Sequence, residues 1–196
     1  MFDVQSLIRP HLRNMKPYVS ARHDYRGEAV AWLDANENPF PADLNRYPDP
    51  DQQILKQTIA RLKGVDPAMI FIGNGSDEAI DLLMRACCTP GKDSILVLPP
   101  TYGMYRVSAA IQGIAVEEVP LRADFSMDED AIAQTLRTGM IRMLFVCSPN
   151  NPTGTVMDPL AISRLAASFQ GLVVVDEAYM DFHAGRENDS MLSRLM

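Results

Sequence analysis

Apolar and polar residues alternate along this chain in two ways, as short apolar runs and as longer stretches with helical spacing. From Asp51 apolar side chains recur at helical intervals up to Gly64, which predicts a helix of about three turns that ends at glycine. The runs that predict strands are Met69–Ile72, Ser94–Leu98, Ile114–Val119, Ile141–Cys147 and Leu172–Val175. The stretches that predict helices between them are Asp77–Cys88, Tyr102–Ala110, Met127–Thr138 and Asp158–Phe169. This alternation favours an α/β fold, a three-layer α/β/α domain with a mostly parallel sheet.

The first part of the chain lacks this regularity. Residues 1–45 are rich in Pro, Asn and Arg and only weakly periodic, which is typical of an arm that lies over another surface. We therefore expect an N-terminal arm over residues 1–45 and an α/β domain over residues 46–196. With 196 residues and 47% hydrophobic side chains, the chain is long enough to bury one substantial core.

Charge and composition exclude several classes of function. The net charge of −7 argues against a broad surface for nucleic acid or for an anionic membrane. No apolar stretch approaches the length of a membrane span, and the first residues do not have the pattern of a signal peptide. The three cysteines include the vicinal pair Cys87-Cys88 and are expected to be core thiols in a reducing compartment, the cytoplasm. The three histidines are scattered without ligand spacing, so we expect no metal site.

Two of the predicted strands stop at polar clusters. One is followed by the segment Cys147-Ser-Pro-Asn-Asn-Pro-Thr-Gly154, and the other ends in Asp176-Glu-Ala-Tyr179. Strands of an α/β sheet deliver such clusters to one shared crevice, so Asn151, Asp176 and Tyr179 are expected around a common ligand. A carboxylate at a strand end suits a protonated ring nitrogen, and an amide and a phenol suit an anionic ring oxygen. Pyridoxal phosphate has both groups, although Asp176 alone could equally cap a turn.

These residues belong to a longer series of motifs, and the chain resembles the fold-type-I pyridoxal-phosphate aminotransferases. The matching segments, in family order, are Lys16-Pro-Tyr-Val-Ser-Ala-Arg22, Asp34-Ala-Asn-Glu-Asn-Pro39, Arg46-Tyr-Pro48, Gly73-Asn-Gly-Ser-Asp-Glu78, Pro99-Pro-Thr-Tyr-Gly-Met-Tyr105, Ser148-Pro-Asn-Asn-Pro-Thr-Gly154 and Asp176-Glu-Ala-Tyr179. They cover nearly the whole chain. The resemblance implies that the domain of residues 46–196 is part of the large cofactor-binding domain, and that the family's C-terminal small domain is absent.

The resemblance also assigns roles around the cofactor ring. It implies that Asp176 keeps the pyridinium nitrogen protonated, so that the ring can act as an electron sink. Asn151 and Tyr179 would donate hydrogen bonds to the phenolic oxygen of the ring, which stabilises its anionic form. Asp176 and Tyr179 are thus the expected catalytic residues. The aromatic ring of Tyr102 would stack on the cofactor; without the resemblance, core packing explains Tyr102 equally well.

A glycine-rich turn before a predicted helix offers a place for the phosphate. In Ile70-Phe-Ile-Gly-Asn-Gly-Ser76 a predicted strand gives way to a helix N-terminus, where unpaired N–H groups and the helix dipole favour an anion. The resemblance implies that the backbone amides of Ser76 and Asp77 hold the phosphate, with the carboxylates of Asp77 and Glu78 turned away. A tight turn capped by Ser76 is the alternative.

Two further tyrosines receive roles from the resemblance alone. Tyr47 would reach the cofactor phosphate of a neighbouring subunit, which implies a homodimer with composite sites; as a single residue it could simply anchor a loop. Tyr18 would contact the phosphate of the substrate.

The expected activity needs one residue that this sequence does not place in the family's context. The family's Schiff-base lysine lies beyond the Asp-Glu-Ala-Tyr segment, whereas the lysines here are Lys16, Lys56, Lys63 and Lys92, all before it. We therefore expect an N-terminal part of an enzyme that is inactive alone. The implied reaction is transamination between L-histidinol phosphate and 2-oxoglutarate, giving imidazole acetol phosphate and glutamate, in histidine biosynthesis. The alternatives are an aromatic amino acid aminotransferase, a relative that decarboxylates threonine phosphate, or a non-catalytic fragment that binds the cofactor or a partner.

Overall fold

A computed structural model describes residues 3–19, 25, 27, 29–40, 44–138 and 140–194 of the chain. The chain divides into two compact units, one made of Met1–Asn14 with Gly73–Met196 and the other of Met15–Ile72. These bounds differ from residue 45, where we expect the arm to end. Leu7 is 1% exposed in the core of the larger unit and the Arg9 N–H donates to the Ala86 carbonyl, so the first residues fold with the α/β part.

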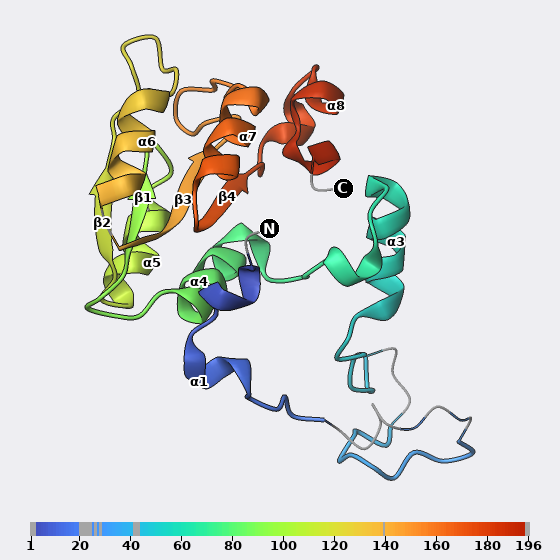
Figure 1. The fold of residues 1–196 in the computed structure, drawn as a ribbon. Helices are drawn as coiled ribbons and strands as arrows, with labels where there is room; N and C mark the ends of the chain where they lie inside the picture. Colours follow the sequence, from blue (N-terminus) through green and yellow to red (C-terminus); the bar gives the residue numbers. More distant parts are fainter. Residues whose placement is uncertain are drawn as a thin grey trace. The chain divides into compact units, whose positions relative to one another are not determined.

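The larger unit is built on a parallel sheet of four strands (Figure 1). The strands are β1 (Ser94–Val97), β2 (Ala115–Glu118), β3 (Ile141–Cys147) and β4 (Leu172–Asp176). Their spatial order is β2-β1-β3-β4, and every neighbouring pair is parallel. Each of these strands was predicted from an apolar run, and their parallel pairing confirms the expected α/β class.

Helices connect the strands. In the larger unit they are α1 (Pro10–Arg13), α4 (Gly75–Cys87), α5 (Met104–Ile111), α6 (Glu129–Thr138), α7 (Pro159–Ser168) and α8 (Arg186–Asp189), with the 3₁₀ turns η1 (Val4–Leu7), η3 (Met180–Phe182) and η4 (Met191–Arg194). The four predicted helices correspond to α4, α5, α6 and α7. At α7 the Asp158 carboxylate accepts the Leu160 N–H at 2.9 Å and Pro159 is the first helical residue, as the sequence predicts.

Alternate residues of the strands enter two separate cores, and this makes the three layers. On one face Ile95 of β1 and Phe145 of β3 pack with α4 and α5. On the other face Leu96 and Leu144 pack with α6 and α7. Because successive side chains of a strand point to opposite faces, a continuous apolar run is what a sheet covered on both sides requires.

The smaller unit contains α3 (Gln53–Lys63) and the 3₁₀ turn η2 (Pro67–Met69). Gly64 has a φ of 69° at the end of α3, where glycine adopts the left-handed conformation without strain. The strand predicted over Met69–Ile72 is wrong. Ile70–Ile72 pair with no strand among the described residues and Phe71 is 59% exposed, because an apolar run becomes a strand only where a ladder partner is available.

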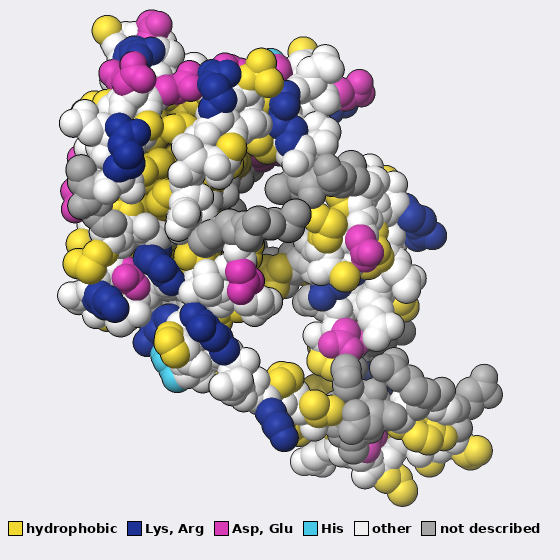
Figure 2. Space-filling view, viewed as in Figure 1, with side chains coloured by type: hydrophobic (Ala, Val, Ile, Leu, Met, Phe, Trp, Pro, Cys, Tyr) yellow, Lys and Arg dark blue, Asp and Glu magenta, His cyan; other side chains and the backbone are white. Residues whose placement is uncertain are grey.

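The surface over α6 and α7 carries side chains of both signs (Figure 2). Arg164 of α7 forms a salt bridge of 2.9 Å with Glu129 of α6, and Arg122 pairs with Asp128 at 3.2 Å. Across the part of the chain that the structure describes, every helix is too short or too polar to cross a lipid bilayer.

Candidate cofactor site

The order of the strands creates a crevice at their carboxyl ends. From β1 the chain proceeds first to β2 on one side and later to β3 and β4 on the other, so the loops after β1 and β3 diverge. Ligands of open α/β sheets bind at such a switch point. The polar segment Ser148–Gly154 follows β3 there, and Asp176 is the last residue of β4, in register with Cys147.

Asp176 has a carboxylate that is fixed on two sides. The residue is 9% exposed. Its Oδ1 accepts the N–H of Ala178 at 3.1 Å, and its Oδ2 accepts the hydroxyl of Tyr105 at 2.8 Å. The hydrogen bond from Ala178 is a short-range contact that any aspartate at the end of a strand can form. The hydrogen bond from Tyr105 joins residues that are far apart in the sequence. A buried carboxylate that two donors orient is suited to accept a further charged donor.

Tyr105, which contacts Asp176, is a residue that sequence reasoning missed. It lies on α5, three positions after Tyr102, and is fully buried. Its ring stacks on Phe145 of β3, with centroids 4.8 Å apart, and meets the Tyr102 ring edge-on at 5.6 Å. Burial and the negative charge of Asp176 raise the pKa of the Tyr105 hydroxyl, so this group keeps its proton and donates. Tyr102 precedes α5, and the available clue was the three-residue spacing of the two tyrosines in the stretch predicted as a helix over Tyr102–Ala110.

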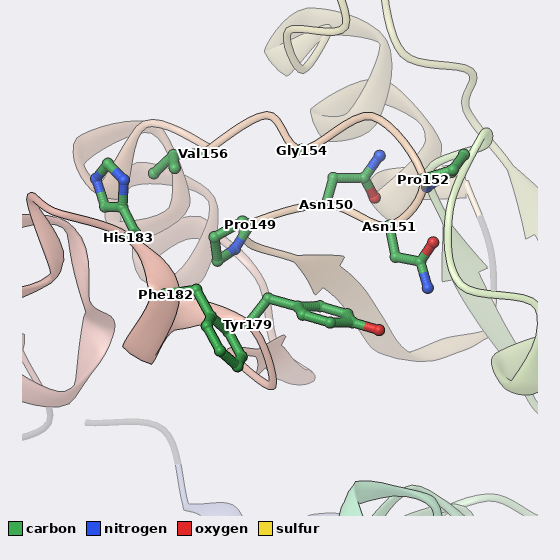
Figure 3. Close-up of a pocket in the computed structure, with 9 residues that line it drawn as sticks. All are labelled: Pro149, Asn150, Asn151, Pro152, Gly154, Val156, Tyr179, Phe182 and His183. Atoms are coloured by element: carbon green, nitrogen blue, oxygen red, sulfur yellow. The ribbon is translucent and has the colours of Figure 1, made fainter.

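Of the three residues expected around a common ligand, Asn151 and Tyr179 line one cavity, and Asp176 is not among the residues that line it. The cavity has a volume of about 380 Å³, within the range of small-molecule sites. Figure 3 shows the Asn151 amide and the Tyr179 ring extending toward the same space, with Phe182 beside the tyrosine. Tyr179 is 48% exposed, so its hydroxyl is accessible to a ligand.

Tyr102 connects the aromatic cluster to the first turn of α4. Its hydroxyl donates to the Asp77 carboxylate at 3.1 Å. Partial burial, this hydrogen bond and the nearby charges of Asp77 and Asp176 raise the pKa of Tyr102. The contact turns the Asp77 side chain toward the Tyr102 hydroxyl.

The N-terminus of α4 has an acidic partner within its own helix. The helix begins at Gly75, with Asn74 as its N-cap residue and Ser76 exposed in the first turn. The Glu78 carboxylate accepts the Asn74 backbone N–H at 2.5 Å and the Asn74 side-chain amide at 3.0 Å. This carboxylate thus turns back to the N-terminus of α4, and the expectation that it is turned away is wrong for Glu78. Ser76 therefore does not cap this turn, because the cap position falls two residues earlier.

The side chain of Asn150, the neighbour of Asn151, is held by hydrogen bonds within the protein. Its side-chain amide donates to the Pro100 carbonyl and to the Thr153 hydroxyl, each at 2.9 Å, and the residue is 3% exposed. Pro100 belongs to the loop after β1 and Asn150 to the loop after β3. The hydrogen bond therefore ties together the two loops that border the crevice.

Tyr18 and Tyr47 belong to the smaller unit, where they are 93% and 62% exposed. The side chain of Glu37, for which the sequence suggested no role, accepts the Tyr47 N–H at 2.8 Å and pairs with Arg46 at 2.6 Å. Glu37 thus shapes the loop that presents Tyr47.

The larger unit contains one lysine, Lys92, which is exposed. Lys92 lies two residues before β1, at the end of the sheet opposite to the crevice. The structure accordingly places Asp176 and its neighbours together without a lysine from this unit beside them.

Comparisons with known proteins agree with this arrangement. The family model described as aminotransferase class I and II matches residues 24–195. A histidinol-phosphate aminotransferase of Cytophaga hutchinsonii is 51% identical over 92% of this chain and 53% of the relative. One of Bacteroides fragilis is 46% identical over 100% of this chain and 56% of the relative. The chain thus spans about half the length of the curated relatives it matches.

Solved structures of histidinol-phosphate aminotransferases share the fold of this chain. Histidinol-phosphate aminotransferase from Sinorhizobium meliloti, in complex with pyridoxal-5'-phosphate, gives a TM-score of 0.63 at 26% identity over 68% of this chain and 36% of that chain. The enzyme from Clostridium acetobutylicum gives a TM-score of 0.68 at 24% identity over 78% of this chain and 44% of that chain, and it supports the fold alone. The expected α/β architecture of the fold-type-I enzymes is confirmed, and the chain belongs to the class I and II aminotransferase family.

Proposed function

We propose that this protein serves the pyridoxal-phosphate-dependent transamination of L-histidinol phosphate with 2-oxoglutarate, a step of histidine biosynthesis. The observation that carries the proposal is the buried Asp176 carboxylate at the end of β4, in register with the end of β3, after which Asn151 lines one cavity with Tyr179. The relative of Cytophaga hutchinsonii bears the name of this enzyme, and the neighbour of Sinorhizobium meliloti is in complex with pyridoxal-5'-phosphate.

The residues present fit the ring of this cofactor. Each carboxylate oxygen has two acceptor sites, so Asp176 can accept a ring N–H in addition to its two bonds within the protein. The Asn151 amide and the Tyr179 hydroxyl extend into the adjacent cavity and supply donors for the ring oxygen (Figure 3). When bound, the cofactor supplies a ring that withdraws electrons from the substrate carbon. Asp176 and Tyr179 promote this by holding a proton at the ring nitrogen and a negative charge at the ring oxygen.

We propose the first turn of α4 as the phosphate site, with the amides of Ser76 and Asp77 as donors. Helix N-termini carry unpaired N–H groups and a partial positive charge. The bond from Tyr102 to Asp77 draws one acidic side chain aside, and the Tyr102 ring is the proposed stacking partner of the cofactor. Tyr47 of a neighbouring subunit would add a phosphate contact and Tyr18 a substrate contact, which makes the proposed working form a homodimer.

A non-catalytic role for residues 1–196 by themselves has its own support in the position of Lys92. Transamination needs a base that moves a proton at the substrate carbon, and Lys92 lies at the opposite end of the sheet. We therefore propose that residues 1–196, as part of a large domain, bind the cofactor without turnover.

The three cysteines are free and buried, which supports a reducing compartment, the cytoplasm.

Binding to the 196-residue chain tests the cofactor assignment. Pyridoxamine 5'-phosphate lacks an aldehyde and reports the site without reacting with lysines, so its dissociation constant is measured by calorimetry. Asp176→Ala is expected to weaken binding at least tenfold, because the partner of the ring nitrogen is lost. Asp124→Ala, on the loop before α6, is the matched control and is expected to have no effect. Equal affinities for Asp176→Ala and the unaltered chain would refute the assignment.

Two further measurements test turnover and substrate. Pyridoxal phosphate with borohydride, followed by peptide mass spectrometry, is expected to label no single lysine; selective labelling of Lys92 would show a nucleophile within this chain. A form of the protein that spans the full length of its relatives is expected to transaminate histidinol phosphate in preference to aromatic amino acids. The reverse preference would favour the aromatic aminotransferase alternative.

A further inference from the structure

Tyr105 reaches Asp176 through the core. The tyrosine lies on α5, which follows β1, and the aspartate ends β4, with β3 between these strands. The Tyr105 ring packs against Phe145 of β3, nearly parallel to it at 23°, and its hydroxyl emerges 2.8 Å from Oδ2 of Asp176. The contact therefore depends on the packing of the whole α4–α5 face of the sheet.

A phenylalanine would fill the same space, so packing alone does not account for the hydroxyl. A buried hydroxyl is unfavourable without an acceptor, and its acceptor is the one carboxylate that we assign to the cofactor. The Ala178 N–H holds the other oxygen of the same carboxylate. Two donors, one on each oxygen, leave the side chain of Asp176 no freedom to rotate.

We propose that Tyr105 is a positioning residue, whose hydroxyl holds the Asp176 carboxylate in the orientation that receives the ring nitrogen of the cofactor. This inference rests on the proposed function and deepens it. Tyr105 is fully buried and acts through Asp176 rather than by touching the ring itself.

Two ligands separate positioning from packing in the 196-residue chain. One is pyridoxamine 5'-phosphate, and the other is its carbocyclic analogue, in which a C–H group replaces the ring nitrogen. Tyr105→Phe is expected to weaken binding of the first ligand about tenfold, the effect of losing a hydrogen bond to a charged group, and to leave the analogue within about twofold. The readout is the ratio of the two dissociation constants, because a general loss of structure weakens both ligands alike.

Phe145→Leu is the matched control. It disturbs the aromatic pair and keeps the Tyr105 hydroxyl, so it is expected to lower the midpoint of urea unfolding and to leave the ratio unchanged. A double-mutant cycle with Asp176→Asn adds a measurement that needs no ligand. The effects of Tyr105→Phe and Asp176→Asn on the free energy of unfolding are expected to be non-additive, because the two groups share one hydrogen bond.

The outcomes separate this inference from the proposed function. If the unaltered chain binds pyridoxamine 5'-phosphate more tightly than the analogue and Tyr105→Phe leaves that ratio unchanged, the inference fails alone. Additive effects in the unfolding cycle also overturn it. If the unaltered chain binds both ligands equally or neither of them, the assignment of Asp176 in the proposed function fails, and the role of Tyr105 fails with it.

Discussion

The hydrogen bonds of Asn150 predict a measurable difference between two adjacent asparagines. Asn150 is 3% exposed and its amide donates two hydrogen bonds, to the Pro100 carbonyl and the Thr153 hydroxyl. A neutral hydrogen bond contributes about 1 kcal/mol, so Asn150→Ala is expected to lower the free energy of unfolding by about 2 kcal/mol. For a chain of this size that corresponds to a fall in melting temperature of about 4–8 °C.

Asn150→Asp sharpens the test, since it keeps the shape and removes the donor. At neutral pH a carboxylate would face the Pro100 carbonyl oxygen, so the loss is expected to be at least as large as for alanine. As the pH falls toward about 4 the introduced carboxyl gains a proton and can donate again, so its deficit against the unaltered chain is expected to shrink.

Urea unfolding followed by circular dichroism gives these free energies, provided the m-value stays constant. Asn151→Asp is the control, because Asn151 lines the cavity and is only half-buried; its loss is expected to stay below about 1 kcal/mol. Equal losses at the two positions would refute the claim that Asn150 ties the loops after β1 and β3 together. So would an Asn150→Asp variant as stable as the unaltered chain.

Three further results are expected. In a protein that spans the full length of the relatives, Asp176→Ala should lower kcat/KM on the order of 100-fold and Tyr47→Phe about tenfold, and equal losses would contradict the assigned roles. The hydrogen bond from Arg164 lowers the pKa of Glu129, so the stabilisation that this pair gives to the fold is complete above the unfolded pKa of about 4.3 and disappears as the pH falls through the lower folded value. Glu129→Gln should therefore lower the free energy of urea unfolding by less than about 1 kcal/mol at pH 7 and leave it unchanged at pH 2. A loss that persists at pH 2 would argue against the ion pair as its cause. Burial raises the pKa of the Cys88 thiol to about 12, so iodoacetamide at pH 8 should label it only after unfolding, and rapid labelling of the native chain would show that this core opens.

The sequence was sufficient for the centre of the sheet because β1 and β3 lie between two helical layers. Ile141–Cys147 enters both cores, so its apolar run needs no alternation and is recognisable at once. Met69–Ile72 is also an apolar run and forms no strand. Composition reports that a segment can be buried, whereas pairing depends on a neighbour that the local sequence does not specify.

The candidate site shows the same division between local and distant information. Asn151 and Tyr179 line one cavity because each follows the carboxyl end of a strand, which the order of elements alone predicts. The contact of Asn74 with Glu78 and the loop contact of Asn150 could not be predicted, because neighbouring polar residues at a turn differ only in the direction of their side chains. Tyr105 was missed for a related reason: its partner Asp176 is 71 residues away in the sequence.

The distance in sequence between Tyr105 and Asp176 has a consequence for how the site is maintained. An isolated buried carboxylate is costly, and its two donors offset that cost only while α5 and β4 keep their places on either side of β3. A substitution at Phe145 that keeps this hydrogen bond is therefore expected to lower the stability of the core and to leave the preference for a ring nitrogen unchanged. Removal of the Tyr105 hydroxyl is expected to change that preference, because it takes away the donor that orients the Asp176 carboxylate.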